Sequence, residues 1–170
     1  MTLRFTTMPS PVGELTLVAN DAGLTAVLWE NDEPDRVRLG AMVEDRDDPI
    51  LTHAARELAA YFAETLTAFT VPLDFRGTDF QKSVWAALLT IPFGETRSYG
   101  EIARQIGRPA ASRAVGAANG RNPISIIAPC HRVIGSDGAL TGFAGGLAAK
   151  ALLLGIEGHA PRTDEQISLF

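Results

Sequence analysis

Cysteine and histidine are scarce in this chain of 170 residues, which contains one Cys, Cys130, and three His. A lone cysteine cannot form an internal disulfide, and the four residues offer no spacing typical of a structural zinc site. No apolar run approaches the ~20 residues of a membrane-spanning helix, and the first residues lack the basic-then-apolar pattern of a secretory signal. We therefore expect a cytoplasmic monomer with no metal, cofactor, membrane contact or obligate protein partner.

Positive charge is also in short supply, since 15 Lys and Arg stand against 20 Asp and Glu. The deficit is uneven along the chain. Residues 1–75 hold five basic and thirteen acidic residues, whereas residues 76–158 hold nine basic and five acidic ones. Because neutralisation of phosphates supplies most non-specific affinity for nucleic acid, only the second half is suited to that partner.

The first half, residues 1–75, has the pattern of a small α+β domain with an antiparallel sheet. Three short apolar segments, 3–7, 15–19 and 24–28, are separated by turn residues and predict strands. Apolar residues recur at helical spacing over 50–69, and 71–75 is expected to return to the sheet as a strand. The acidic residues 44–48 between them predict a solvated loop.

The second half, residues 76–158, is predominantly helical, and residues 159–170 form a tail. Asp79 is placed to cap a first helix. Ser98 and Glu101 form a capping-box pattern at the start of a second helix, and Pro109 is placed to begin a third that runs to Ala118. Two short helices joined by a tight turn indicate a helix-turn-helix. A hairpin wing is expected over 134–141 and a closing helix over 147–154.

The third predicted helix carries almost only small side chains, with Arg113 its one long residue. Two interpretations are open. Small residues allow a helix to pack closely inside a protein. They also allow a helix to approach a narrow surface such as the minor groove of DNA, about 6 Å wide, with Arg113 as the probe.

The segment 122–134 contains the most specific pattern, Pro-Cys-His-Arg-Val around Cys130. A lone cysteine is more often a structural residue than a nucleophile. The complete run, however, resembles the active-site signature of the O6-alkylguanine-DNA alkyltransferases. The resemblance covers residues 76–158 with order and spacing kept, and it includes these further matches: Ser98-Tyr99-Gly100-Glu101-Ile102-Ala103, Arg113-Ala114-Val115-Gly116, Asn122-Pro123, Gly142-Phe143-Ala144-Gly145-Gly146-Leu147 and Glu157-Gly158.

The resemblance implies a ribonuclease-H-like first domain, a winged helix-turn-helix second domain and direct repair of double-stranded DNA. Cys130 would accept a methyl or alkyl group from O6 of guanine in a single irreversible turnover. His131 would remove the thiol proton through a water, Glu157 would orient His131, and Asn122 would order the turn that holds the site. Glu157 could otherwise be an ordinary carboxylate near a helix end.

Substrate contacts are implied for four further residues. Tyr99 would line the pocket and donate a proton to the leaving guanine, although a tyrosine in the first turn of a helix is also simply half-buried in many proteins. Backbone groups of Val133 and Ala144 would bind the guanine edge, and Phe143 would form the lip of the pocket. Tyrosine is common in place of Phe143, and serine in place of Ala144.

Contacts to DNA are implied around the third helix. Arg113 would fill the gap left when the guanine rotates out of the stack. Arg108, Ala114, Gly116 and Ser136 would contact the DNA alongside it.

Three other functions are alternatives to this interpretation of the sequence. A winged-helix regulator without transferase activity would share the basic second half and would need neither Cys130 nor His131. A Cys-His hydrolase would need an oxyanion hole, for which the sequence contains no signature. The non-catalytic alkyltransferase-like proteins lack the cysteine that this chain keeps.

Overall fold

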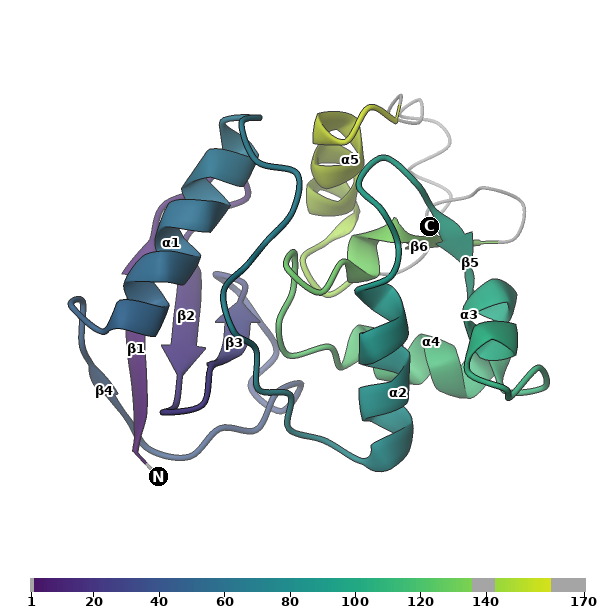
Figure 1. The fold of residues 1–170 in the computed structure, drawn as a ribbon, viewed down its shortest axis with the longest axis horizontal. Coiled ribbons are helices and arrows are strands. Elements are labelled where there is room, and N and C mark those ends of the chain that lie inside the picture. The colour runs from purple at the N-terminus through teal and green to yellow at the C-terminus, as the bar shows by residue number, and fades with distance from the viewer. Residues whose placement is uncertain (1, 136–142, 160–170) are drawn as a thin grey trace. The chain divides into compact units, whose positions relative to one another are not determined.

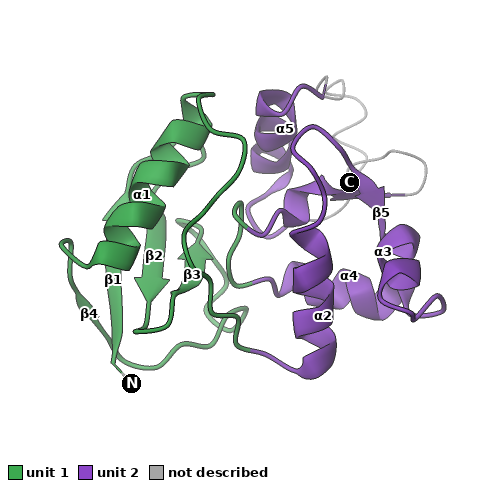
Figure 2. Ribbon diagram, in the orientation of Figure 1, with its two compact units in different colours: residues 1–76, 123–127 green, residues 77–122, 128–170 purple. Residues whose placement is uncertain are grey.

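The structure, a computed structural model, describes residues 2–135 and 143–159. The chain divides into two compact units (Figure 2). One consists of residues 1–76 and 123–127, the other of residues 77–122 and 128–170. Residues 123–127, which lie within the predicted second domain, therefore belong to the first unit. Within the described part of the chain, no helix is long and apolar enough to cross a membrane.

The first unit contains a four-stranded sheet, of order β3-β2-β1-β4. Its strands are β1 (Leu3–Met8), β2 (Leu15–Ala19), β3 (Leu24–Leu28) and β4 (Met42–Glu44). The first three form the expected antiparallel meander, with Thr6 opposite Leu17. The sequence did not predict β4, which pairs parallel to β1 at the far edge. The sheet is thus mixed, because the long connection after β3 returns the chain to the opposite edge in the same direction as β1.

Helix α1 (Pro49–Phe62) packs against this sheet (Figure 1). It begins at Asp48, whose carboxylate accepts the backbone N–H groups of Ile50 and Leu51 and also pairs with Arg4. Asp48 is buried, so the expectation of a fully solvated acidic loop was wrong at this residue. The helix also ends earlier than Phe69, because Glu64 adopts the left-handed conformation with φ of 61°.

Residues 71–75 do not form the expected strand. A single parallel bridge joins Leu24 to Leu73, with Leu24 donating to the carbonyl of Pro72 at 2.8 Å and Asp74 to that of Leu24 at 2.8 Å. Pro72 has no N–H to donate, which prevents extension of the ladder at that residue.

The second unit contains four α-helices among its described residues, a 3-10 helix and a two-stranded parallel pair. These elements are α2 (Asp79–Leu88), β5 (Arg97–Ser98), α3 (Tyr99–Gln105), α4 (Ser112–Gly120), the 3-10 helix Cys130–Arg132, β6 (Val133–Ile134) and α5 (Leu147–Ile156). Helices α3 and α4 pack together as the expected helix-turn-helix. The predicted hairpin wing falls largely on residues 136–142, outside the described residues.

Helix starts in this unit follow local hydrogen bonding. Thr78, not Asp79, caps α2, and it forms a capping box with Gln81. The box predicted from Ser98 and Glu101 is confirmed at α3. Helix α4 begins at Ser112 instead of Pro109, because residues 108–111 first form a turn in which Ala111 donates to the carbonyl of Arg108.

Residues 123–127 lie beside strand β3 of the first unit. The N–H of Val27 donates to the carbonyl of Pro123 at 2.9 Å, and Val27 forms a parallel bridge with Ile124. Two residues later, the fully buried Ile126 has φ of 74°. A β-branched residue is strongly disfavoured in this left-handed region, so the segment holds a strained turn four residues before Cys130.

Candidate active site

Cys130 begins the 3-10 helix Cys130–Arg132 and is buried, with 4% of its surface exposed. Two asparagines at the end of α4 hold the backbone around it. The side-chain amide of Asn122, which is fully buried, donates to the carbonyl of Ala128 at 2.8 Å. That of Asn119 donates to the carbonyl of Cys130 at 3.4 Å. The end of α4 and the turn containing the thiol are therefore joined by hydrogen bonds at both sides of Pro129.

His131, next along the chain, is completely buried beside Glu157, which follows the last residue of α5. Nε2 of His131 lies 2.7 Å from Oε2 of Glu157. Among the described residues, Nδ1 of His131 has no hydrogen-bond partner. With Glu157 ionised, Nε2 donates to the carboxylate, and Nδ1 carries the free lone pair of the neutral ring.

Arg132 also binds the carboxylate of Glu157. Its Nε donates to Oε1 of Glu157 at 2.6 Å and its Nη2 to Oε2 at 3.0 Å, while Nη1 donates to the carbonyl of Ile91 at 2.6 Å. The guanidinium also lies 5.9 Å from the centre of the Phe93 ring. This bidentate pair neutralises Glu157 inside the protein.

Burial, more than the neighbouring charges, determines the direction of the pKa shift of His131. Burial lowers the pKa of His131 most, and the cations Arg132 and Lys150 lower it further, against the raising effect of Glu157. A neutral imidazole with an unoccupied Nδ1 lone pair is the form that can accept a proton.

Lys150 is a fully buried cation on α5. Its Nζ donates to the carbonyl of Val133 at 2.7 Å and lies 5.7 Å from the centre of the Phe143 ring. Burial lowers the pKa of Lys150 to about 8, and the charge of Cys130 opposes that shift. The thiol, the imidazole and the ammonium are thus electrostatically coupled.

Tyr99 is half-buried at the first position of α3 and faces α4. A Cβ built on Gly116 would lie 3.8 Å from two carbons of the Tyr99 ring. Gly116 therefore allows the backbone of α4 to approach the phenol ring, and a longer side chain at 116 would meet that ring.

Comparisons with known proteins agree over the whole chain. The family described as "6-O-methylguanine DNA methyltransferase, ribonuclease-like domain" matches residues 3–75, and the corresponding "DNA binding domain" matches residues 79–159. A methylated-DNA–protein-cysteine methyltransferase of Mycobacterium bovis is 51% identical over 170 residues, 99% of each chain. One of Methanosarcina acetivorans is 52% identical over 149 residues, which are 88% of this chain and 94% of that protein. The crystal structure of Mycobacterium tuberculosis OGT in complex with DNA superposes with a TM-score of 0.84 at 53% identity, covering 93% of this chain and 95% of that one. The chain belongs to the 6-O-methylguanine DNA methyltransferase family.

The family assignment confirms the resemblance stated from the sequence, with its ribonuclease-like and DNA-binding halves. Of the remaining predicted residues of this methyltransferase, Val133 is fully buried in β6, and Gly116 is half-buried on α4. Arg113 and Ala114 are exposed on α4, whereas Val115 and Ala118 on its other side are buried. Arg108 is exposed in the turn before α4. The small-residue helix thus packs on one side and presents an open face on the other.

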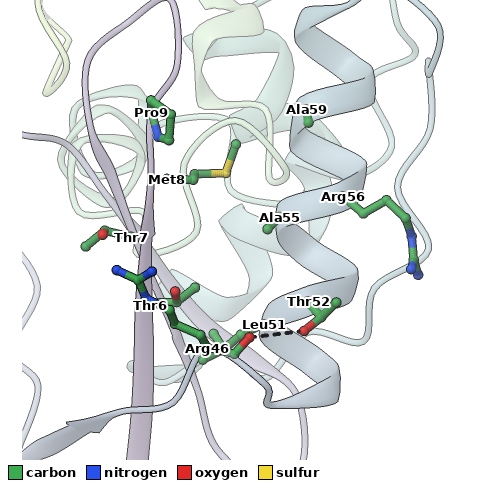
Figure 3. Close-up of a pocket in the computed structure, with 10 residues that line it drawn as sticks. All are labelled: Thr6, Thr7, Met8, Pro9, Arg46, Leu51, Thr52, Ala55, Arg56 and Ala59. Atoms are coloured by element: carbon green, nitrogen blue, oxygen red, sulfur yellow. Dashed lines mark hydrogen bonds between the residues drawn. The ribbon is translucent and has the colours of Figure 1, made fainter.

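Two residues predicted to contact the substrate, Phe143 and Ala144, are among the described residues. Phe143 is half-buried and Ala144 is exposed, whereas Ser136 lies outside the described residues. A separate groove lies in the first unit between β1 and α1, where Met8 and Pro9 face Ala55 and Ala59 (Figure 3). It contains none of the residues predicted from the sequence.

Three residues of the site were assigned no role from the sequence: Arg132, Lys150 and Asn119. A signal existed for Lys150, which interrupts the apolar run 147–154. Charged side chains are almost never fully buried unless they are paired, so a charge in an apolar element marks a polar partner inside the protein. Nothing in the sequence distinguishes Asn119. Among the described residues, no group of His, Cys, Asp and Glu could hold a metal ion.

Proposed function

We propose that this methyltransferase repairs double-stranded DNA by moving a methyl or larger alkyl group from O6 of guanine to Sγ of Cys130. The bond between O6 and the alkyl carbon breaks, and a bond between that carbon and sulfur forms. The names of the relatives support this function, as does the burial of Cys130 immediately before His131, which is hydrogen-bonded to the buried Glu157. We also propose the cytoplasm as its compartment, because a lone reactive thiol needs reducing surroundings.

The observation that carries the proposal is the buried His131, which follows Cys130 in the chain and whose Nε2 lies 2.7 Å from Oε2 of Glu157. A thiol of ordinary pKa, about 8.5, is mostly protonated at neutral pH and is then a weak nucleophile. Nδ1 of His131 accepts the Cys130 proton through a bridging water, and the positive charge that develops on the ring is stabilised by Glu157 at Nε2. Asn122 keeps the turn in place through the carbonyl of Ala128.

The leaving guanine carries the negative charge released when the O6 bond breaks. Tyr99 donates a proton to it, which lowers the energy of the departing base. The backbone of Val133 and Ala144 binds the guanine edge, and Phe143 packs at the lip. The product thioether is not reversed by thiol reductants, so each molecule acts once.

Chemistry on a stacked base requires the base to leave the duplex. Helix α4 and the turn before it supply the contacts: Arg113 enters the space the guanine vacates, and Ala114, Gly116 and Arg108 lie against the DNA, with Ser136 as a further contact. A winged-helix regulator would need this surface but not the buried Cys130, His131 and Glu157 cluster, and no observation favours it.

The test is the intact mass of the protein after incubation with a duplex that contains one O6-methylguanine. We expect a single added methyl group, located on the peptide with Cys130. Cys130→Ser should bind the duplex and transfer nothing, because an alcohol is far less ionised at neutral pH. Stoichiometric transfer by that variant would refute Cys130 as the acceptor.

A further inference from the structure

Arg132 is a buried cation of the site to which the proposed relay gives no step. It is the last residue of the 3-10 helix that begins with Cys130, and only 6% of its surface is exposed. Its guanidinium contacts Glu157, the residue that the relay uses to orient His131. A buried charge in contact with a relay residue acts on the proton that the relay moves.

Arg132 and His131 donate to the same oxygen of Glu157. Nη2 of Arg132 lies 3.0 Å from Oε2, and Nε2 of His131 lies 2.7 Å from it, while Nε of Arg132 donates to Oε1 at 2.6 Å. The guanidinium therefore binds both oxygens of the carboxylate that receives the imidazole N–H. A carboxylate shared with a guanidinium attracts a proton to His131 less than it would without that cation.

Two further contacts hold the guanidinium beside Glu157. Nη1 of Arg132 donates to the carbonyl of Ile91 at 2.6 Å, and the guanidinium carbon lies 5.9 Å from the centre of the Phe93 ring. Neither contact involves His131. We therefore expect the cation to stay in place when a proton arrives on the imidazole ring.

The other charged and titratable groups around His131 come from the elements that pack against its 3-10 helix. On that helix, on α5 and just after α5 they are Cys130, Arg132, Lys150 and Glu157. Asp79 and Lys82, the titratable residues of α2, are exposed to solvent. Burial lowers the pKa of His131 most, Glu157 raises it, and the charges of Arg132 and Lys150 lower it. The direction of the Arg132 effect agrees with the shared carboxylate.

We propose that Arg132 is a positioning residue that, through Glu157, keeps His131 unprotonated until the thiol gives up its proton. The role rests on the proposed transfer to Cys130 and extends it. Without the guanidinium, the buried carboxylate would retain a proton on His131, and Nδ1 would have no lone pair for the thiol proton. With it, Glu157 orients the ring and stabilises its positive charge only while the proton from Sγ is on Nδ1. No bond to Arg132 forms or breaks.

The first test is the protonation state of His131, measured by long-range ¹H–¹⁵N NMR spectra of the histidine rings. The chain has three histidines, and His131→Ala assigns the signal. In the wild type at pH 7 we expect a proton on Nε2 and none on Nδ1, whereas in Arg132→Met both nitrogens should carry one. A protonated Nδ1 in the wild type would overturn the proposal without any variant. An unchanged spectrum in Arg132→Met would overturn it as well.

Three further variants separate the charge from packing. Arg132→Met combined with Glu157→Gln loses the same side chain but has no carboxylate charge, so Nδ1 should again be unprotonated at pH 7. If both nitrogens stayed protonated, Glu157 would not be the cause. Arg104→Met removes an exposed cation of α3 and should leave the spectrum unchanged. Should Arg132→Met not fold, Arg132→Lys decides: an ammonium cannot bind both oxygens as a fork, so His131 should titrate at higher pH than in the wild type. An equal or lower midpoint would overturn the proposal.

Transfer from free O6-benzylguanine tests the consequence for the reaction. The acidic limb of a pH–rate profile reports the loss of an essential base. In Arg132→Met this limb should move up by about one pH unit, which is about a tenfold loss of rate at a pH on the limb, and the two rates should converge at alkaline pH. A loss of equal size at every pH would assign Arg132 to the fold alone. If the wild type accepted no benzyl group while the His131 spectrum still changed in Arg132→Met, the proposed function would fail and the role of Arg132 toward His131 would stand.

Discussion

Glu157 shares its carboxylate between an imidazole that must gain a proton and a guanidinium that always carries one. Glu157→Gln therefore does two things. It weakens the stabilisation of protonated His131, and it leaves Arg132, only 6% exposed, without its counter-ion. Breaking one partner of a buried ion pair costs about 3–5 kcal/mol. We expect a slower transfer with a pH profile moved upward, together with a large loss of stability.

The two effects separate when Arg132 is changed as well. Glu157→Gln with Arg132→Met removes the stranded charge, so urea denaturation should show part of the stability restored while the benzylguanine rate stays low. Adding His131→Ala to Glu157→Gln should cost little further rate if the two act in one relay. Full activity and a wild-type pH profile in Glu157→Gln would instead reduce Glu157 to a structural partner of Arg132.

The lowered pKa of Lys150 predicts how the stability of the folded protein changes with pH. Its pKa is about 8 in the folded protein and 10.5 when exposed, so the unfolded chain binds more protons between these values. Stability therefore rises with pH from 8 to 10.5, and the full penalty, about 3 kcal/mol, is present below pH 8. Lys150→Met removes this dependence, at the cost of the hydrogen bond to Val133.

Urea denaturation at pH 7 and near pH 10 measures this effect. Relative to wild type, Lys150→Met should be as stable or more stable at pH 7 and less stable near pH 10, where the wild-type lysine is neutral. A stability difference that does not change with pH would contradict the lowered pKa.

Helix α4 is the element on which recognition of duplex DNA depends in the proposed mechanism. Arg113 lies on its exposed face, and unstacking a base costs a few kcal/mol. Arg113→Ala should slow repair of O6-methylguanine in a duplex by one or two orders of magnitude while the reaction with free O6-benzylguanine stays near wild type. Arg104→Ala, an exposed arginine of α3, is a comparison for loss of charge alone. Equal slowing on both substrates would assign Arg113 to the fold.

Elements were predicted well where one local signal decides their limits. The bounds of β2 and β3 follow from alternating apolar residues between turn residues, and the start of α3 from its capping box. Predictions were wrong where non-local contacts decide. Strand β4 forms because β1 offers a free edge, and the 71–75 strand is reduced to one bridge by Pro72.

The site was predictable to a similar extent. The motif around Cys130 was enough to predict the roles of Cys130 and His131, because the two residues are adjacent in the sequence. The contacts of Arg132 with Glu157 and Ile91, 25 and 41 residues away, carry no sequence signal of their own. A neutral His131 is also a property of the assembled cluster, because burial and the two cations act on it only in the fold.

For the protein as a whole, metal ions are not expected to matter. The described residues offer no cluster of ligands, and the relay uses a side-chain base. Incubation with EDTA should change neither the benzylguanine rate nor the midpoint of thermal unfolding. Loss of activity that zinc restores would reveal a metal site.

The chain crosses between its two units three times, at residue 76, before 123 and after 127. This arrangement limits how the two halves of the chain can be exchanged between related proteins. Although each half matches its own family description, the halves are not interchangeable modules, because five residues encoded in the second half fold beside β3 of the first. A recombination that joined this second half to a distant relative's first half would have to carry over a β3 edge able to bind Pro123 and Ile124, or the strained turn before Cys130 would lose its support.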